Sequence, residues 1–136
     1  PRKKLPIGIQ SFAVLREADA YYYVDKTPMA LELIDKGRYY FLSRPRRFGK
    51  SLFLDTLKEM FEGNQALFTG LAAEKGWDWS VKHPVIRISF GGGVLKAKAA
   101  LDTRIQEILR NNRERLAISR PVAWSAADVA GDFSAL

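Results

Sequence analysis

The chain has 136 residues, of which 47% are hydrophobic and 27% charged. That composition is typical of a globular domain and excludes a disordered, collagen-like or low-complexity chain. The sequence contains no cysteine and one histidine, which excludes disulfides and thiolate metal sites and argues against a histidine-based zinc site. No apolar run approaches the roughly 20 residues of a membrane span, and no signal-peptide pattern follows the basic start. We therefore expect a cytoplasmic protein without a membrane partner.

Positive charge is concentrated in the first part of the chain. The formal net charge is +7, and residues 1–50 hold 11 lysines and arginines against 5 acidic residues, whereas residues 101–136 hold 5 of each kind. Four of the cations, Arg44, Arg46, Arg47 and Lys50, belong to one short stretch. Such a cluster suggests an anionic partner, either phosphate or nucleic acid. The alternative, which charge alone favours, is a solvated basic face that aids solubility.

The first half of the chain contains two short strand-like runs around a helix. Residues 21–24 are rich in strand formers. Thr27 and Pro28 then predict a helix start, with threonine as the N-cap and proline at the first helical position, and Gly37 predicts its end. Residues 39–42 form an apolar run that predicts a buried strand.

The clearest helix follows at residues 50–62. Its apolar residues, at positions 53, 54, 57, 60 and 61, share one helical face. Residues 64–84 predict a loop with short turns, in which Phe68, Trp77 and Trp79 are the expected anchors.

The second half adds one strand and one long helix. Residues 85–90 place alternate apolar side chains on one strand face, and glycines 91–93 break the strand. A long helix is expected over residues 96–118, and another is expected to start at Ser125. The order of elements predicts an α/β fold: a parallel sheet flanked by helices, containing the strands at 39–43 and 85–90, with a right-handed crossover between them.

The segment between the second strand and the helix carries the chemistry. It reads Ser-Arg-Pro-Arg-Arg-Phe-Gly-Lys-Ser over residues 43–51, and strand, loop and helix in that order is the arrangement of a phosphate-binding loop. A helix N-terminus offers unpaired N–H groups and the positive end of the helix dipole. Gly49 would let the backbone approach the anion, Lys50 would reach the β- and γ-phosphates, and the Ser51 hydroxyl would bind magnesium.

The loop departs from the common pattern at one position. Arg44 stands where the consensus has glycine, and Pro45 after it has no N–H to donate. The alternative interpretation is a basic strand-to-helix turn without a ligand.

Several stretches together resemble the AAA-ATPase-like family of bacterial proteins. The resemblance covers essentially the whole chain. It lies in residues 5–12, 23–27, 39–52, 61–63, 67–68 and 83–86. In that family the loop reads Arg-Pro-Arg-Arg-Phe-Gly-Lys-Ser, as it does at residues 44–51 here, so Arg44 is the family's own variation.

The resemblance implies a P-loop NTPase-like fold that binds ATP and Mg²⁺. The chain would be the N-terminal portion of a single ATPase-like domain spanning residues 1–136, and longer members often carry a restriction-endonuclease-like nuclease domain after it. The implied nucleotide-binding residues are Arg46, Arg47, Phe48, Gly49, Lys50, Ser51 and Leu52, with Ser51 also the metal ligand.

A catalytic acid is not identified. An ATPase of this class needs an apolar strand ending in Asp or Asp-Glu to hold magnesium and orient water, and nothing after Ser51 fits. Asp25 follows a suitable strand but precedes the loop, so we interpret it as a turn or cap residue. The sequence therefore predicts an ATPase-like activity for a full-length protein and an inactive enzyme for this chain alone.

A second hypothesis comes from a different functional class. The basic loop would belong to a non-catalytic module that binds nucleic acid or a partner domain. Lys50 followed by Ser51 is explained by nucleotide binding and is not required by this alternative.

Overall fold

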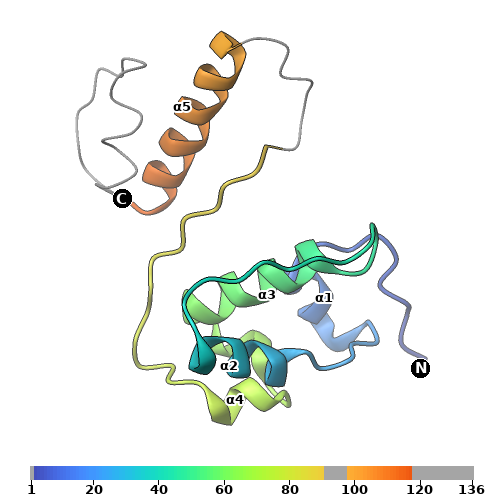
Figure 1. Cartoon of the computed structure of the whole chain (residues 1–136). Coiled ribbons are helices and arrows are strands. Elements are labelled where there is room, and N and C mark those ends of the chain that lie inside the picture. Colours follow the sequence, from blue (N-terminus) through green and yellow to red (C-terminus); the bar gives the residue numbers. More distant parts are fainter. Residues whose placement is uncertain (1, 91–97, 118–136) are drawn as a thin grey trace. The chain divides into compact units, whose positions relative to one another are not determined.

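The computed structural model describes residues 2–90 and 98–117, which belong to two compact units, residues 1–85 and 86–136 (Figure 1). Helices make up the regular structure of these described residues. The first unit contains α1 (Phe12–Arg16), the 3-10 helix η1 (Glu17–Asp19), α2 (Thr27–Lys36), α3 (Lys50–Phe61), the 3-10 helix η2 (Gln65–Phe68) and α4 (Ala72–Gly76). The second unit contains α5 (Lys98–Arg115).

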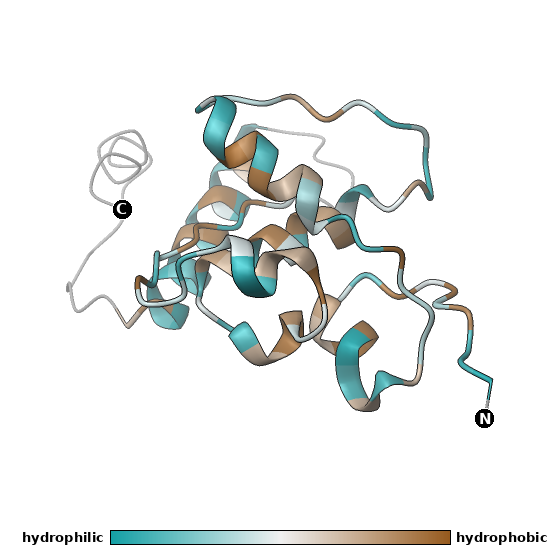
Figure 2. Cartoon of the chain, turned by 90° about the horizontal axis from the view of Figure 1, so that it is seen from below, coloured by the Kyte–Doolittle hydropathy of each residue, from teal (hydrophilic) through white to brown (hydrophobic). Residues whose placement is uncertain are grey.

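The core of the first unit gathers one or two apolar side chains from each helix except η1. The buried members are Phe12, Leu15, Ala30, Phe53, Met60, Phe68 and Ala73. Aromatic rings link them, since the Phe12 and Phe68 ring centroids lie 4.9 Å apart and the Phe68 and Trp79 centroids are also 4.9 Å apart. Figure 2 shows apolar and polar residues interspersed along the helical ribbons, as amphipathic helices require. The expected anchors are confirmed, because Phe68 is buried and both Trp77 and Trp79 pack against this core.

Helix α1 is attached to α3 by a buried carboxylate. Asp55, on α3, is 5% exposed, and its Oδ2 accepts a hydrogen bond of 2.7 Å from the Phe12 N–H in the first turn of α1. The Ser11 hydroxyl accepts a further bond from the Val14 N–H at 3.4 Å. A carboxylate at a helix N-terminus satisfies an unpaired N–H and complements the helix dipole. Asp55 therefore fixes where α1, and the chain that enters it, lies against α3.

A second polar connection joins the first turns of α2 and α4. Asp25 Oδ1 accepts bonds from the N–H and the hydroxyl of Thr27, at 2.8 and 2.7 Å, and its Oδ2 accepts a bond of 2.8 Å from the Ala72 N–H. The buried Thr27 hydroxyl accepts in turn from the Ala73 N–H at 3.0 Å. Asp25 thus caps two helices, which confirms its interpretation as a cap residue and shows that it satisfies N–H groups in both.

The predicted parallel sheet is absent from the described residues, so the α/β assignment is wrong. They contain no strand, and their β-pairing is a single parallel bridge between Lys4 and Tyr21. Residues 39–42 run back along α3 without a neighbouring strand (Figure 1), with Tyr39 94% and Phe41 92% exposed while Leu42 packs against the core. Strand propensity describes side chains that fit a pleated, half-buried surface. A run of such residues forms no strand where no second backbone pairs with it.

Residues 85–90 also differ from the prediction, because a side chain takes the place of a neighbouring strand. The buried Asn112, on α5, accepts from the Arg87 N–H at 2.9 Å and donates to the Arg87 carbonyl at 2.7 Å. Its amide satisfies both main-chain groups of one residue, as a ladder partner would. The parallel pairing of 39–43 with 85–90, and the crossover between them, are therefore wrong.

The longer helices agree with the sequence predictions. The helices expected at 50–62 and from Thr27 to Gly37 correspond to α3 and α2, and the described part of 96–118 contains α5. The predicted cap was wrong by one residue, because Lys26 is the N-cap of α2, Thr27 is its first residue and Pro28 its second. The region 64–84 contains η2 and α4, which were expected only as turns. The helix expected from Ser125 lies outside the described residues.

Asp25 should make the stability of the first unit depend on pH. Burial acts to raise its pKa, but the hydrogen bonds from Ala72 and Thr27 outweigh burial, and the pKa lies below its ordinary value of 3.8. The folded state therefore gains stability from the carboxylate above this pH and loses it as the pH falls through the lowered pKa. In Asp25→Asn the new NH₂ group faces the Ala72 N–H, so we expect a lower free energy of unfolding near neutral pH and a shrinking difference from wild type below about pH 4.

Urea unfolding followed by circular dichroism between pH 7 and pH 2 measures this. Asp35→Asn is the matched control, because Asp35 is an exposed aspartate near the end of α2. A difference for Asp25→Asn that stays constant across this range would contradict the assignment.

Candidate functional site

The N-terminus of α3 is open and lacks a side-chain cap. Gly49 occupies the N-cap position with φ of 75°, in the left-handed region, and no side chain bonds to the first turn. The first main-chain bond of the helix runs from the Phe53 N–H to the Gly49 carbonyl, at 2.9 Å. The N–H groups of Lys50, Ser51 and Leu52 therefore have no partner within the helix. Helix α1 differs, because Ser11 and Asp55 satisfy its first turn.

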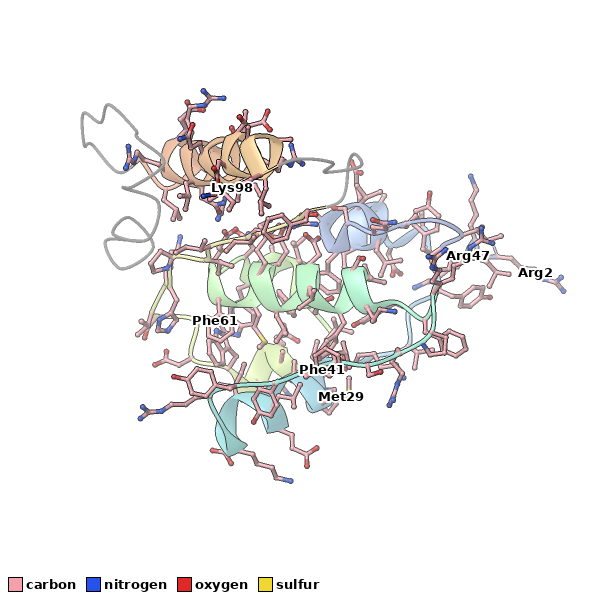
Figure 3. The ribbon with its side chains drawn as sticks, turned by 45° about the horizontal axis from the view of Figure 1, so that its top comes forward. Arg2, Met29, Phe41, Arg47, Phe61 and Lys98 are labelled. Atoms are coloured by element: carbon pink, nitrogen blue, oxygen red, sulfur yellow. The ribbon has the colours of Figure 1, made fainter. Side chains whose placement is uncertain are left out.

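The loop before α3 is shaped by two left-handed residues. Arg47 has φ of 66° and Gly49 has φ of 75°, so the backbone reverses between residues 47 and 49. Figure 3 places Arg47 at the turn that leads into α3 and Phe61 at the other end of the helix. Glycine adopts this conformation without penalty, whereas an L-residue such as Arg47 carries a strain of the order of 1 kcal/mol or more.

The Lys50 side chain folds back over the loop. Its Nζ donates to the carbonyls of Arg44 and Pro45, the second at 2.8 Å. The ammonium group thus lies on the loop's own main chain. Since these acceptors are neutral carbonyls, an anion within reach would compete with them for the same protons.

The remaining predicted site residues surround this turn. Arg46, Arg47 and Ser51 are exposed, and so is Phe48. Leu52 differs, because its side chain is partly buried and packs against the core. The structure therefore gathers Gly49, Lys50 and Ser51 at one helix end.

Two cavities meet at this end of α3. The first, of about 650 Å³, is largely apolar, and its walls include Tyr22, Met29, Leu42 and Phe48. The second, of about 730 Å³, lies between residues 47–52 and the segment 6–10. We call them the apolar cavity and the loop cavity. The sequence analysis did not identify the segment Pro6–Gln10 as part of the site, although Gly8, with φ of 77°, marks the turn within it.

Magnesium would depend on few protein ligands here. Across residues 2–90 and 98–117, no group of three or more histidine, cysteine, aspartate or glutamate side chains is placed to hold a metal ion. Mg²⁺ in phosphate sites keeps several waters and takes one or two protein ligands in addition to phosphate oxygens. The exposed Ser51 hydroxyl at the open helix end fits that limited role.

His83 has a packing role. The ring centroids of His83 and Phe61 lie 5.6 Å apart in an edge-to-face arrangement. The main-chain N–H of His83 donates to the Phe61 carbonyl at 2.8 Å. It lines neither cavity.

None of the helices in the described part of the chain has the length and apolar character needed to cross a bilayer.

Comparison with known proteins identifies the class. The chain matches the family described as Predicted AAA-ATPase over residues 6–136, and it belongs to this family. It is similar to a protein of Azotobacter chroococcum mcd 1 described as "Uncharacterized protein in vnfD 5'region", with 63% identity over 118 residues. That alignment covers 87% of this chain but only 23% of the relative. No solved structure matches the chain.

Membership of this family supports a nucleotide-binding role. The matched region includes the loop before α3 and the open end of that helix.

Gly49→Ala should separate the loop's conformation from general stability. Alanine in the left-handed region costs about 1–2 kcal/mol, and the added Cβ would meet no other atom within 4 Å, so the cost arises in the backbone. Gly70→Ala is the matched control, because Gly70 has φ of 79° and equally open surroundings away from the site. We expect both variants to lower the free energy of unfolding by similar amounts and only Gly49→Ala to weaken nucleotide binding, measured by urea unfolding and calorimetric titration. If the two variants bind nucleotide with equal affinity, the conformation of Gly49 does not contribute to the site.

Proposed function

We propose that residues 44–51 and the first turn of α3 bind the phosphates of a nucleotide, most simply ATP with Mg²⁺. The observation that carries the proposal is the uncapped N-terminus of α3 beside the Lys50 ammonium group. Three N–H groups without helix partners and the positive end of the helix dipole favour a bound anion at this place. The Gly-Lys-Ser order puts a cation and a hydroxyl beside it.

Phosphate binding would redirect the Lys50 side chain. The ammonium group exchanges its neutral carbonyl partners, Arg44 and Pro45, for phosphate oxygens, and charge-assisted bonds are about twice as strong as neutral ones. The carbonyls it leaves lie on exposed residues and can bond to water. Reorientation of Lys50 therefore leaves no buried polar group unsatisfied.

The two loop arginines would act through their charge at longer range. Arg46 and Arg47 add positive potential around the open helix end and would steer an anion toward it. Ser51 would contribute its N–H to phosphate and its hydroxyl to Mg²⁺. Phe48, exposed on the loop, would border the nucleotide without accepting or donating a bond.

The exposed basic loop also motivates the alternative, binding of nucleic acid. In that case Arg46, Arg47 and Lys50 would contribute comparably, and each neutralised contact would lower the salt dependence of binding by about one. If a nucleotide binds, Lys50 should dominate, because it belongs to the first turn of α3 and its ammonium group already lies over the loop.

Lys50→Ala should weaken nucleotide binding by about ten- to a hundredfold. Loss of a charge-assisted contact costs roughly 1.5–3 kcal/mol, which corresponds to this change in the dissociation constant. Calorimetric titration with a non-hydrolysable ATP analogue and Mg²⁺ measures it, with Arg46→Ala and Arg47→Ala expected to have smaller effects.

Lys75→Ala is the control for net charge, since Lys75 is an exposed lysine on α4 away from both cavities. Parallel titrations with single-stranded DNA at several salt concentrations test the alternative. The proposal fails if Lys50→Ala binds the analogue as wild type does, or if the three loop variants weaken DNA binding equally while the analogue does not bind.

A further inference from the structure

The loop cavity has two walls of different chemistry. One wall contains Gly49, Lys50 and Ser51, the residues of the open helix end, together with Arg47. The other wall is the segment Pro6–Gln10 that precedes α1. At about 730 Å³ the cavity lies within the 300–1,000 Å³ range usual for small-molecule sites.

The second wall suits a flat heterocycle better than it suits phosphate. It contains no charged side chain, and its apolar groups come from Pro6, Ile7 and Ile9. Ile7 is 87% exposed, so a large apolar side chain faces solvent at the mouth of this cavity. Among the described residues the side-chain amide of Gln10 and the main-chain N–H of Gly8 make no hydrogen bond. Both groups are therefore available to bond to the polar edge of a ring. Nucleobases are held by apolar side chains against the ring and by hydrogen bonds to its edge.

The apolar cavity is a weaker candidate for the same ligand. It contains Gly49 and Lys50 but not Ser51, so it adjoins only part of the open helix end. Its walls are mainly aliphatic and aromatic side chains, and their polar members include Tyr22, Lys26 and Arg44. The loop cavity combines the complete open end of α3, including Ser51, with a wall that is both apolar and able to form hydrogen bonds.

We infer that the segment Pro6–Gln10 forms the base-binding side of the nucleotide site, so that the ligand is a nucleoside triphosphate and not inorganic polyphosphate. This inference rests on the proposed function, because the base can occupy this wall only if the phosphates lie at the N-terminus of α3. The exposed Ile7 contacts the face of the base, and the Gln10 side chain bonds to its edge, while Ile9 packs against the core and holds this segment in place. Asp55 supports the arrangement, because it fixes the start of α1 directly after this segment.

The test compares two ligands that share the phosphate chain. ATP and tripolyphosphate, each with Mg²⁺, are titrated calorimetrically into wild type, Ile7→Ala, Gln10→Ala and Lys50→Ala. Val14→Ala is the matched control, since Val14 is an exposed aliphatic residue on α1 that lines neither cavity. Ile7 and Gln10 are exposed, so their variants should fold, which circular dichroism verifies.

We expect Ile7→Ala and Gln10→Ala each to weaken ATP binding about three- to tenfold and to leave tripolyphosphate binding unchanged, while Lys50→Ala weakens both. The inference is overturned, and the phosphate site retained, if wild type binds both ligands equally and the segment variants change neither. Equal weakening of the two ligands by Ile7→Ala also overturns it, because the effect would then lie in the loop. If wild type binds neither ligand, the proposed function and this inference fail together.

Discussion

The candidate site depends on one buried hydrogen bond between α3 and α1. Asp55 lies on the helix whose open end forms the site, and it bonds to the first N–H of α1, which directly follows the other wall of the loop cavity. Two segments some 40 positions apart in sequence are thereby held in register. An unsatisfied buried N–H costs about 1–3 kcal/mol, so the energy that stabilises the fold also keeps the two walls together.

The helices of the first unit differ in whether the N–H groups at their N-termini have side-chain acceptors. Side chains accept hydrogen bonds from N–H groups in the first turns of α1, α2 and α4, with Asp55, Ser11, Asp25 and Thr27 as the acceptors, whereas no side chain caps α3, which begins after Gly49. Satisfying a helix end stabilises a fold, and leaving one open at the surface retains donors for a ligand. The distribution of caps therefore distinguishes the structural helix ends from the candidate binding end.

The sequence predicted the three longest described helices, α2, α3 and α5, and the loop, because these depend on local signals. Helical periodicity, Gly37 and Gly63 determine α2 and α3 within a residue or two, and Gly49-Lys50-Ser51 is contiguous. The sheet prediction failed because strand formation requires a second backbone, which the run at 39–42 lacks in the described residues. Segment 6–10 was missed for a related reason, since long-range contacts, among them the bond between Asp55 and Phe12, bring it near the loop.

The exposed segment at residues 39–42 has a consequence for how copies of the chain behave in solution. Its aromatic side chains and unpaired main chain could pair edge to edge with another molecule, but Arg38 and Arg44 flank it, and the net charge of +7 repels like molecules. Salt shortens the range of that repulsion to about 10 Å at 0.1 M and about 3 Å at 1 M, while the apolar attraction remains. Colloidal stability should therefore fall as ionic strength rises, and light scattering across a salt series would measure it.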